Sequence, residues 1–277
     1  MLISKTIAEI RSHLRQDEIL KRKIALVPTM GALHEGHLAL VKKARELAEI
    51  VVVSIFVNKA QFNDSNDYQK YPRQVEQDLE KLKNSGATHI FIPSDEEIFS
   101  ADFAFKIIPT RMIDCLCGST RPSHFDGVVL IVAKLFNIIK PNISIFGQKD
   151  FQQLQIIKKL VEDLNFDIEI FAHEIVREKS GLAMSSRNQR LSEDNKIKAA
   201  NIFRILSKIK NEVGDCEKIL QKKREELLKI GFEKIDYLEI REEENFKLVK
   251  NFNSQNSARI FVAVYLSGIR LIDNLKL

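Results

Sequence analysis

Short apolar runs alternate with segments of helical periodicity through residues 1–175 of this sequence. The run from Ile50 to Val57 (IVVVSIFV) is rich in β-branched residues, as in a strand that is covered on both faces. In the segment before it, Leu38, Val41 and Ala44 recur at helical spacing. Repeated strand–helix units build a parallel sheet, so we predict an α/β protein with a Rossmann-like parallel sheet.

The same two patterns predict the other elements of this part of the chain. Apolar runs predict further strands at 24–27, 88–92, 143–146 and 167–171, the first two ended by Pro28 and Pro93. Helical periodicity predicts further helices at 75–82, 125–139 and 151–164. Residues 1–20 form an amphipathic pattern with acidic residues, which predicts a helix and does not resemble a signal peptide.

The pattern changes after residue 175, where strands and helices no longer alternate. The polar loop GLAMSSRNQRLS is followed by charged helices near 193–211 and 215–230 and by strand-like segments at 235–240 and 259–266. We therefore predict two domains. Residues 1–175 form the Rossmann-like domain, and residues 176–277 form a smaller C-terminal α+β domain that begins with the polar loop.

Charge and cysteine content argue against several classes of protein. Lys and Arg outnumber Asp and Glu by only 43 to 38, and the basic residues are interspersed with acids, which disfavours a nucleic-acid partner. Three cysteines without disulfide spacing favour reduced thiols in the cytoplasm. Cys115 and Cys117 are closer together than the usual zinc ligands, so we predict no metal site there. No apolar run reaches the ~18 residues of a membrane span.

A polar cluster follows the first predicted strand, at the edge where open α/β sheets bind ligands. It runs from Pro28 to His37, and Gly31 and Gly36 allow the backbone to approach a ligand closely. His34 and His37 lie three apart, on one side of a first helical turn whose N–H groups suit phosphate. Three interpretations are open: histidines that only cap the helix, two metal ligands, or a nucleotide phosphate site.

Three further polar clusters occur in the sequence. Asn58 and Gln61 follow the IVVVSIFV run, where their amides suit a hydroxyl or a carboxylate. Lys149, Asp150 and Gln153 lie at the next strand-to-helix junction, where they could face one site. The fourth cluster overall, Met184–Arg187, offers hydroxyls and a guanidinium to phosphate. Taken alone, each cluster is also compatible with an ordinary polar turn or surface loop.

The HxGH motif resembles the signature of the nucleotidyltransferase superfamily that includes class I aminoacyl-tRNA synthetases. The larger set of motifs is more specific, and it resembles the pantothenate synthetase (pantoate–β-alanine ligase) family over almost the whole chain. The motifs occur in the family's order and at similar spacing: LVPTMGALHEGHLALV, VVVSIFVN, YPRQVEQDLEKL, RPSHFDGV, FGQKDFQQL, VREKSGLAMSSRN and GIRLIDN.

This resemblance implies an AMP-forming ligase of vitamin B5 and coenzyme A biosynthesis. Pantoate would react with Mg²⁺-bound ATP to give pantoyl-adenylate and pyrophosphate, and β-alanine would then displace AMP. The protein would be a cytoplasmic homodimer that binds these small molecules. The alternatives are another nucleotidyltransferase of the same fold and a synthetase-like RNA-binding protein. The absence of a basic patch in the sequence argues against RNA binding.

The family's residue roles transfer to matching positions of this sequence. The ATP site would comprise Met30, Gly31, Ala32, Leu33, His34, Glu35, Gly36, His37, Gly147, Gln148, Lys149, Asp150, Val176, Met184, Ser185, Ser186 and Arg187. Those assigned to catalysis are His34, His37, Lys149, Ser185, Ser186 and Arg187. Gln61 would bind pantoate and β-alanine, Gln153 would bind pantoate, and Asn58 and Arg121 would assist.

The chain departs from the common family pattern at five positions. The family often has Pro, Glu, Gly, Arg and Glu, respectively, where this sequence has Lys59, Cys117, Ser123, Asp126 and Gln148. None of these departures removes a residue assigned to the central chemistry.

Overall fold

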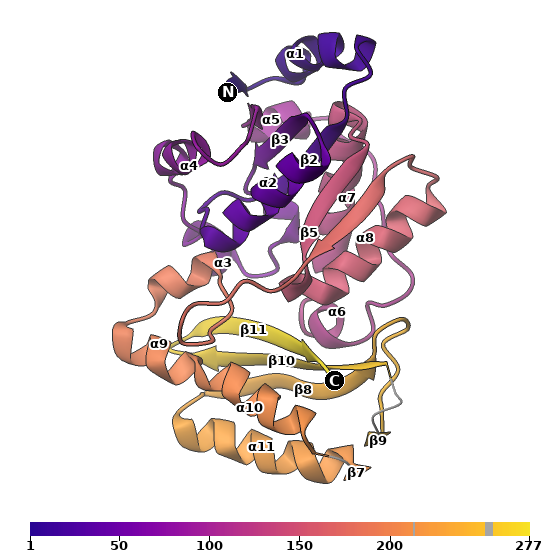
Figure 1. Cartoon of the computed structure of the whole chain (residues 1–277). Coiled ribbons are helices and arrows are strands. Elements are labelled where there is room, and N and C mark those ends of the chain that lie inside the picture. The colour runs from indigo at the N-terminus through magenta and orange to yellow at the C-terminus, as the bar shows by residue number, and fades with distance from the viewer. Residues whose placement is uncertain (213, 253–256) are drawn as a thin grey trace. The chain divides into compact units, whose positions relative to one another are not determined.

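A six-stranded parallel sheet confirms the α/β fold predicted for the first part of the chain (Figure 1). The computed structural model describes residues 1–212, 214–252 and 257–277. The strands lie in the order β1-β4-β3-β2-β5-β6. In chain order they are β1 (Leu2–Ser4), β2 (Ile24–Thr29), β3 (Ile50–Ile55), β4 (His89–Phe91), β5 (Ile143–Gly147) and β6 (Glu169–His173).

The strand order reverses between β2 and β5, near the centre of this sheet. From β2 the chain moves outward through β3 to β4, and it then crosses to β5 on the other side of β2. Ligands of open α/β sheets bind beyond the carboxyl ends of the strands at such a reversal. Met30 directly follows β2 and Gln148 directly follows β5. Two of the polar clusters predicted from the sequence therefore begin at this reversal.

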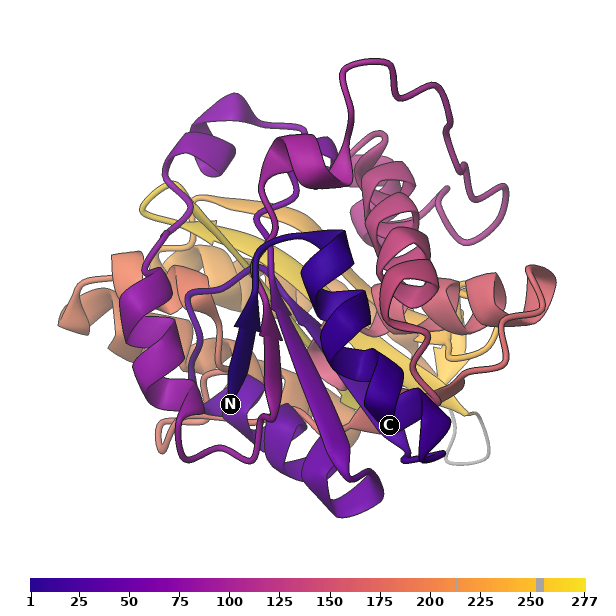
Figure 2. The ribbon, with the colours of Figure 1, turned by 90° about the horizontal axis from the view of Figure 1, so that it is seen from above.

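Helices cover both faces of the parallel sheet (Figures 1 and 2). On one face, α2 (Glu35–Leu47) and α4 (Val75–Leu82) pack against buried side chains of β2, β3 and β4. On the other face, α7 (His124–Ile139) contacts β2 and α1 (Ile7–Ile19). The same part of the chain also forms α3 (Ser65–Gln69), α5 (Asp95–Ile98), α8 (Phe151–Asp163) and the 3-10 turns η1 (Lys59–Gln61) and η2 (Gln148–Asp150).

Residue contacts divide the chain into two units. The first unit comprises residues 1–110, 121–148 and 153–174 and contains the parallel sheet. The second unit comprises residues 111–120, 149–152 and 175–277. The second unit therefore includes two short segments that precede residue 176 in the sequence.

The second unit is built on an antiparallel sheet in the order β11-β10-β8. These strands are β8 (Lys234–Glu242), β10 (Ala258–Leu266) and β11 (Ile269–Lys276). The helices α10 (Asn201–Lys210) and α11 (Cys216–Ile230) lie along one face of the sheet (Figure 1), where they bury a shared apolar core. The unit also contains α6 (Leu116–Thr120), η3 (Ser186–Arg190), α9 (Glu193–Ala199), β7 (Gly214–Asp215) and β9 (Asn251–Phe252).

Two predictions for the first part of the chain were wrong. The helix predicted from residue 1 begins only at Ile7, because Leu2–Ser4 pair as a parallel strand with the distant β4. Pro28 does not end β2, which continues to Thr29 beside β3. The pairing of β2 with β5 involves only Ala25 and Leu26, so the missing N–H of Pro28 costs no bond to that strand.

Two features of the second unit also differ from the prediction. The helix expected at 193–211 is two helices, because Asn201 Nδ2 donates to the carbonyls of Ile197 and Lys198 and competes with a continuous helical backbone. Strand β11 was not predicted as a strand. It forms a hairpin with β10 through Ser267 and Gly268, whose φ angles of +51° and +68° match a tight turn of the type that hairpins favour. No helix among the described residues is long and apolar enough to cross a membrane.

Candidate functional site

The loop between β2 and α2 turns sharply at Gly31. Its φ of +75° lies in the left-handed region, and a Cβ atom there would come within 3.0 Å of Asp78 Oδ2 and of Ile55 Cγ2. Only glycine fits this turn without strain. The Gly31 N–H donates to Thr29 Oγ1 at 3.1 Å, so the end of β2 fixes the first residue of the turn.

A buried carboxylate from α4 holds the next part of this loop. Asp78 is 0% exposed, and its two oxygens accept the N–H groups of Ala32 and Leu33, each at 2.8 Å. Lys81 Nζ donates to the Leu33 carbonyl at 2.6 Å. No role for Asp78 was predicted from the sequence. The available signal was its helical spacing from Leu82, because the two residues lie on the same buried face of α4.

His34 and His37 both bond to the backbone at the start of α2. His34 Nδ1 accepts the N–H of Gly36 at 3.1 Å, and His37 Nδ1 accepts the N–H of His34 at 3.4 Å. A neutral imidazole that accepts at Nδ1 carries its proton at Nε2. The ring centroids are 4.1 Å apart. Capping therefore sets both half-buried rings in the tautomer that can donate to a phosphate oxygen, so the capping and phosphate interpretations are compatible.

Asn58 and Gln61 come together with the first cluster. Asn58 is 1% exposed, and its Nδ2 donates to the carbonyl of Gly127 at 2.9 Å and to Gln61 Oε1 at 3.1 Å. Gln61 Nε2 lies 3.1 Å from Met30 Sδ. The segment after β3 thus places Gln61, a predicted substrate ligand, beside the predicted ATP loop.

Arg121 and His124 bond to the same segment from the start of α7. His124 Nδ1 lies 2.7 Å from the Gln61 carbonyl oxygen, to which Arg121 Nη2 also donates at 3.3 Å. Arg121 Nη1 lies 3.0 Å from His124 Nε2. His124 is buried and was not predicted, although it lies inside the RPSHFDGV motif. A Cβ at Gly127 would lie 2.3 Å from the Ala60 carbonyl oxygen, so glycine permits this close approach.

Two of the five departures from the family pattern have local consequences. Ser123, the residue directly before α7, has a φ of +61°, a left-handed conformation that glycine adopts more easily. Cys117 lies against second-unit residues: its Sγ is 3.2 Å from the Tyr237 hydroxyl oxygen and 3.6 Å from both terminal nitrogens of Arg270. Nothing in the structure explains Lys59, Asp126 or Gln148.

The junction after β5 contains the third predicted cluster. Gly147 is half-buried, and a Cβ there would meet no described atom within 4 Å, which leaves room beside the backbone. Lys149 Nζ lies 3.7 Å from Asp150 Oδ2. Gln152 is buried and holds α6: its Oε1 accepts the N–H of Cys117 at 2.9 Å, and its Nε2 donates to the carbonyl of Cys115 at 2.9 Å. Gln153, the predicted pantoate ligand, is half-buried.

The fourth cluster lies in a loop of the second unit that folds back on itself. The N–H of Met184 donates to the carbonyl of Val176 at 3.0 Å, so two predicted ATP ligands are directly bonded. Ser185 Oγ accepts the N–H of Arg187 at 3.3 Å. Asn188 is buried, and its Nδ2 donates to Glu178 Oε1 at 2.9 Å and to the Ala183 carbonyl at 3.1 Å. These bonds close the loop 176–188.

Two alternative chemistries are a nucleophilic Cys115 thiol and a metal site formed by acidic, histidine and cysteine side chains. Burial raises the pKa of the Cys115 thiol to about 11, so this thiol stays protonated at neutral pH and is a poor nucleophile. Within the described part of the chain, no group of three or more His, Cys, Asp or Glu side chains is arranged to hold a metal ion.

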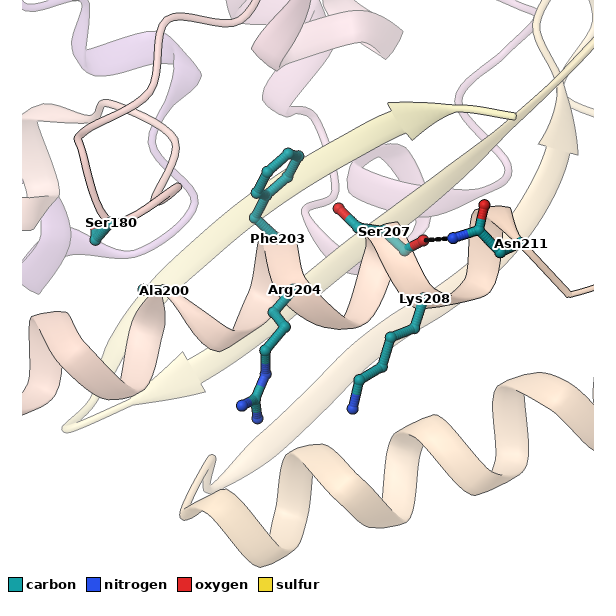
Figure 3. Close-up of a pocket in the computed structure, with 7 residues that line it drawn as sticks. All are labelled: Ser180, Ala200, Phe203, Arg204, Ser207, Lys208 and Asn211. Atoms are coloured by element: carbon teal, nitrogen blue, oxygen red, sulfur yellow. Dashed lines mark hydrogen bonds between the residues drawn. The ribbon is translucent and has the colours of Figure 1, made fainter.

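A hollow of about 500 Å³ lies along α10 in the second unit (Figure 3). Its lining includes Phe203, Arg204 and Lys208 and none of the predicted site residues. Lys208 Nζ and Arg204 Nη2 lie 2.8 Å and 3.9 Å from Glu226 Oε1, so a carboxylate already partners both cations. This hollow therefore shows no built anion site.

Comparisons with known proteins agree on one family. Residues 2–276 match the family described as Pantoate-beta-alanine ligase. The pantothenate synthetases of Thermosipho africanus and Fervidobacterium nodosum are 41% and 43% identical to this chain, each over 99% of both sequences. The crystal structure of pantothenate synthetase from Thermus thermophilus has a TM-score of 0.91 at 36% identity and covers 100% of this chain and 99% of its own. The pantoate-β-alanine ligase from Francisella tularensis, complexed with beta-gamma ATP and β-alanine, has a TM-score of 0.84 at 36% identity and covers 100% and 97%.

Proposed function

The chain belongs to the pantoate–β-alanine ligase family and catalyses the ATP-dependent condensation of pantoate with β-alanine, and we propose that this reaction proceeds through pantoyl-adenylate. AMP and pyrophosphate are then the products from ATP. The relative from Francisella tularensis, complexed with beta-gamma ATP and β-alanine, supports the same small-molecule substrates here.

The observation that carries this proposal is the pair of histidines, His34 and His37, that cap the start of α2. They follow β2 at the reversal of strand order. In the first step, a carboxylate oxygen of pantoate attacks the α-phosphorus, and the bond to the pyrophosphate oxygen breaks. Negative charge increases on the phosphate oxygens. Nε2–H donors of His34 and His37, held by their Nδ1 bonds to the backbone, stabilise that charge.

We assign the remaining ATP contacts to the polar clusters. Met30–His37 and Gly147–Asp150 bind the nucleotide, with Lys149 at phosphate and Asp150 at ribose. Val176 meets adenine through its backbone, and Met184–Arg187 bind phosphate. Mg²⁺ enters with ATP as part of the substrate, which is how a triphosphate usually carries it.

Pantoate is held by the amides of Gln61 and Gln153, with Asn58 and Arg121 in support. In the second step, the β-alanine amine attacks the carbonyl carbon of pantoyl-adenylate. The carbon–oxygen bond to AMP breaks, and the nitrogen loses a proton as the amide forms. The chain's residues contribute positioning and charge stabilisation in both steps, with no covalent link to the protein.

We further propose that residues 1–175 and 176–277 act as an ATP- and pantoate-binding domain and a C-terminal domain that contributes the phosphate loop. A cytoplasmic location is supported by the three buried cysteines, whose spacing does not suit a disulfide framework and which therefore fit a reducing compartment. We also propose a homodimer.

Product analysis with each substrate omitted tests the proposed reaction. Pantoyl-adenylate and pyrophosphate should form in a single turnover when ATP and pantoate are present, and the release of AMP with pantothenate should additionally require β-alanine. Formation of ADP and inorganic phosphate would instead indicate an acyl-phosphate and would overturn the adenylate proposal.

A further inference from the structure

Two adjacent residues near the end of β11 reach different parts of the proposed ATP site. Asp273 is 3% exposed, and its carboxylate forms a two-pronged ion pair with Arg177: Nη1–Oδ2 is 2.6 Å and Nη2–Oδ1 is 3.0 Å. Arg177 directly follows Val176, and its Nη1 also donates to the Gly181 carbonyl at 3.1 Å. Asp273 therefore anchors the loop 176–188 at its first turn.

Asn274 makes a second contact of this kind. It is 2% exposed, and its Nδ2 donates to the carbonyl of Lys149 at 2.9 Å. Its Oδ1 accepts from Arg259 Nη1 at 2.6 Å, which fixes the orientation of the amide. Arg259 is itself held, because its guanidinium lies 4.1 Å from the Phe151 ring centroid and its Nε donates to Glu243 Oε1 at 2.8 Å. The donor that meets the Lys149 backbone is thus rigidly oriented.

We propose that Asp273 and Asn274 are positioning residues for ATP, and this inference rests on the proposed function. Through Arg177 and the Lys149 carbonyl, one strand end sets the positions of two segments assigned to the nucleotide. Neither residue needs to touch ATP. We therefore expect β11 to fix the position of the loop 176–188 relative to Lys149, within the second unit.

The polar chemistry of this pair argues for precise placement over general stability. Burying charged groups is costly, and apolar side chains of similar size often stabilise a core as well or better. A bidentate ion pair between an arginine and a carboxylate, however, fixes both the distance between the two groups and their relative orientation. The same unit contains a second buried pair, Asp236 with Arg270 at 2.8 Å, whose aspartate also bonds Lys234. That pair provides a matched control.

The sharpest test is Asn274→Asp, which keeps an oxygen for Arg259 but replaces the donor to Lys149 with an acceptor. We expect KM for ATP to rise about tenfold, as for the loss of one well-oriented hydrogen bond, with KM for pantoate and β-alanine within about twofold of wild type. Arg177→Lys keeps the charge beside Asp273 but loses the bidentate geometry, and it should raise KM for ATP in the same way. Thermal melting identifies which variants are folded.

The control is Asp236→Asn, which should lower the melting temperature while leaving KM for ATP near wild type. Equal rises in KM for ATP in the control and in Asn274→Asp would reduce Asp273 and Asn274 to general stabilisers, as would normal ATP kinetics in both Asn274→Asp and Arg177→Lys. Failure of the proposed function is seen separately: Arg187→Ala would then leave ATP kinetics unchanged, and wild-type protein would not form pantoyl-adenylate and pyrophosphate from ATP and pantoate.

Discussion

The two loops assigned to ATP are held by different kinds of contact. The loop Met30–His37 lies in a strand–helix turn, where Asp78 accepts two backbone N–H groups and the histidines bond to backbone groups two or three residues away. The loop 176–188 depends on Arg177 and on Asp273, which is 96 residues further along the chain. In the first loop, the anchoring side chains accept backbone N–H groups, whereas the second loop has its own backbone hydrogen bonds and is tied to β11 by an ion pair between side chains.

This difference suggests a division of labour. A loop at the start of a helix whose backbone N–H groups are held by side chains presents preorganised donors, which are most useful where charge develops in the transition state. A loop that is tied to a distant strand by an ion pair suits ground-state binding of the triphosphate. We therefore expect substitutions in the first loop to lower the rate of adenylate formation, and substitutions in the second to weaken ATP binding.

The largest expected effect is that of His37→Ala. Losing one preorganised donor typically slows a reaction by about 10²–10³-fold, so pantoyl-adenylate should form at least ~100-fold more slowly. ATP binding should stay within about tenfold of wild type. Single-turnover kinetics and ATP titration measure the two quantities. Arg187→Ala in the second loop should show the reverse pattern, with ATP affinity affected more than rate.

Near-normal adenylate formation by folded His37→Ala would break the comparison. His34 and His37 would then be ordinary capping residues, and the proposed division between the loops would have no chemical basis.

The next largest effect concerns the binding of pantoate by Gln61, which lies beside the first loop. Gln61→Ala should leave polar groups of bound pantoate without a hydrogen-bond partner. The cost is about 1–3 kcal/mol, or a rise of roughly 5- to 150-fold in KM for pantoate. Gln153→Ala should behave similarly, with ATP binding largely kept in both variants. Steady-state kinetics with each substrate varied distinguishes this from equal weakening of ATP and pantoate, which would contradict the assignment.

A stability change of intermediate size is expected for Asp78→Asn, which tests the anchor of the first loop. The amide nitrogen cannot accept one of the two backbone N–H groups, so the protein should lose about 2 kcal/mol of unfolding free energy. Adenylate formation should also slow, because the histidines follow this turn. Asp17→Asn is the matched control: Asp17 is buried in α1 and pairs with Arg22 at 2.9 Å, so its loss should destabilise without slowing adenylate formation. Urea unfolding and single-turnover kinetics measure both variants.

These anchors show what the sequence could and could not predict. The polar clusters after β2, β3 and β5 were predictable, because strand, loop and helix are neighbours in sequence and the site of an open sheet lies at strand ends. Asp78, His124 and Asn274 were missed because their partners lie 45, 63 and 125 residues away. Nothing local in a sequence specifies such partners. The strand β1 was mistaken for helix for the same reason, since its pairing with β4 is long-range.

The smallest expected effect is a pH dependence of the unfolding free energy that arises from His89, which belongs to neither loop. Burial lowers the pKa of His89, whose Nε2 has no partner among the described atoms, while Asp17 opposes this shift and His13 adds to it. Unfolded histidine titrates near pH ~6.5, so as pH falls below that value the unfolded state takes up the proton first. Folded stability should then decrease by at most about 1.4 kcal/mol per pH unit until the folded pKa is reached.

Urea unfolding between pH 7 and pH 5 measures this decrease, and His89→Gln should flatten it. A decrease of the same size in His89→Gln would show that another group is responsible. We expect the rate of adenylate formation not to follow this change in stability. A rate that fell with stability in the wild-type protein but not in His89→Gln would show that protonation of His89 also affects the loops assigned to ATP.

The most direct test of the adenylate mechanism uses pantoate labelled with ¹⁸O in its carboxylate. If a carboxylate oxygen attacks the α-phosphorus and the carbon–oxygen bond then breaks when β-alanine attacks, that oxygen remains on the phosphate of AMP. Mass spectrometry should therefore find one ¹⁸O atom in the AMP formed and none in pyrophosphate. AMP without label, or label in inorganic phosphate accompanied by ADP, would contradict the proposed adenylyl transfer.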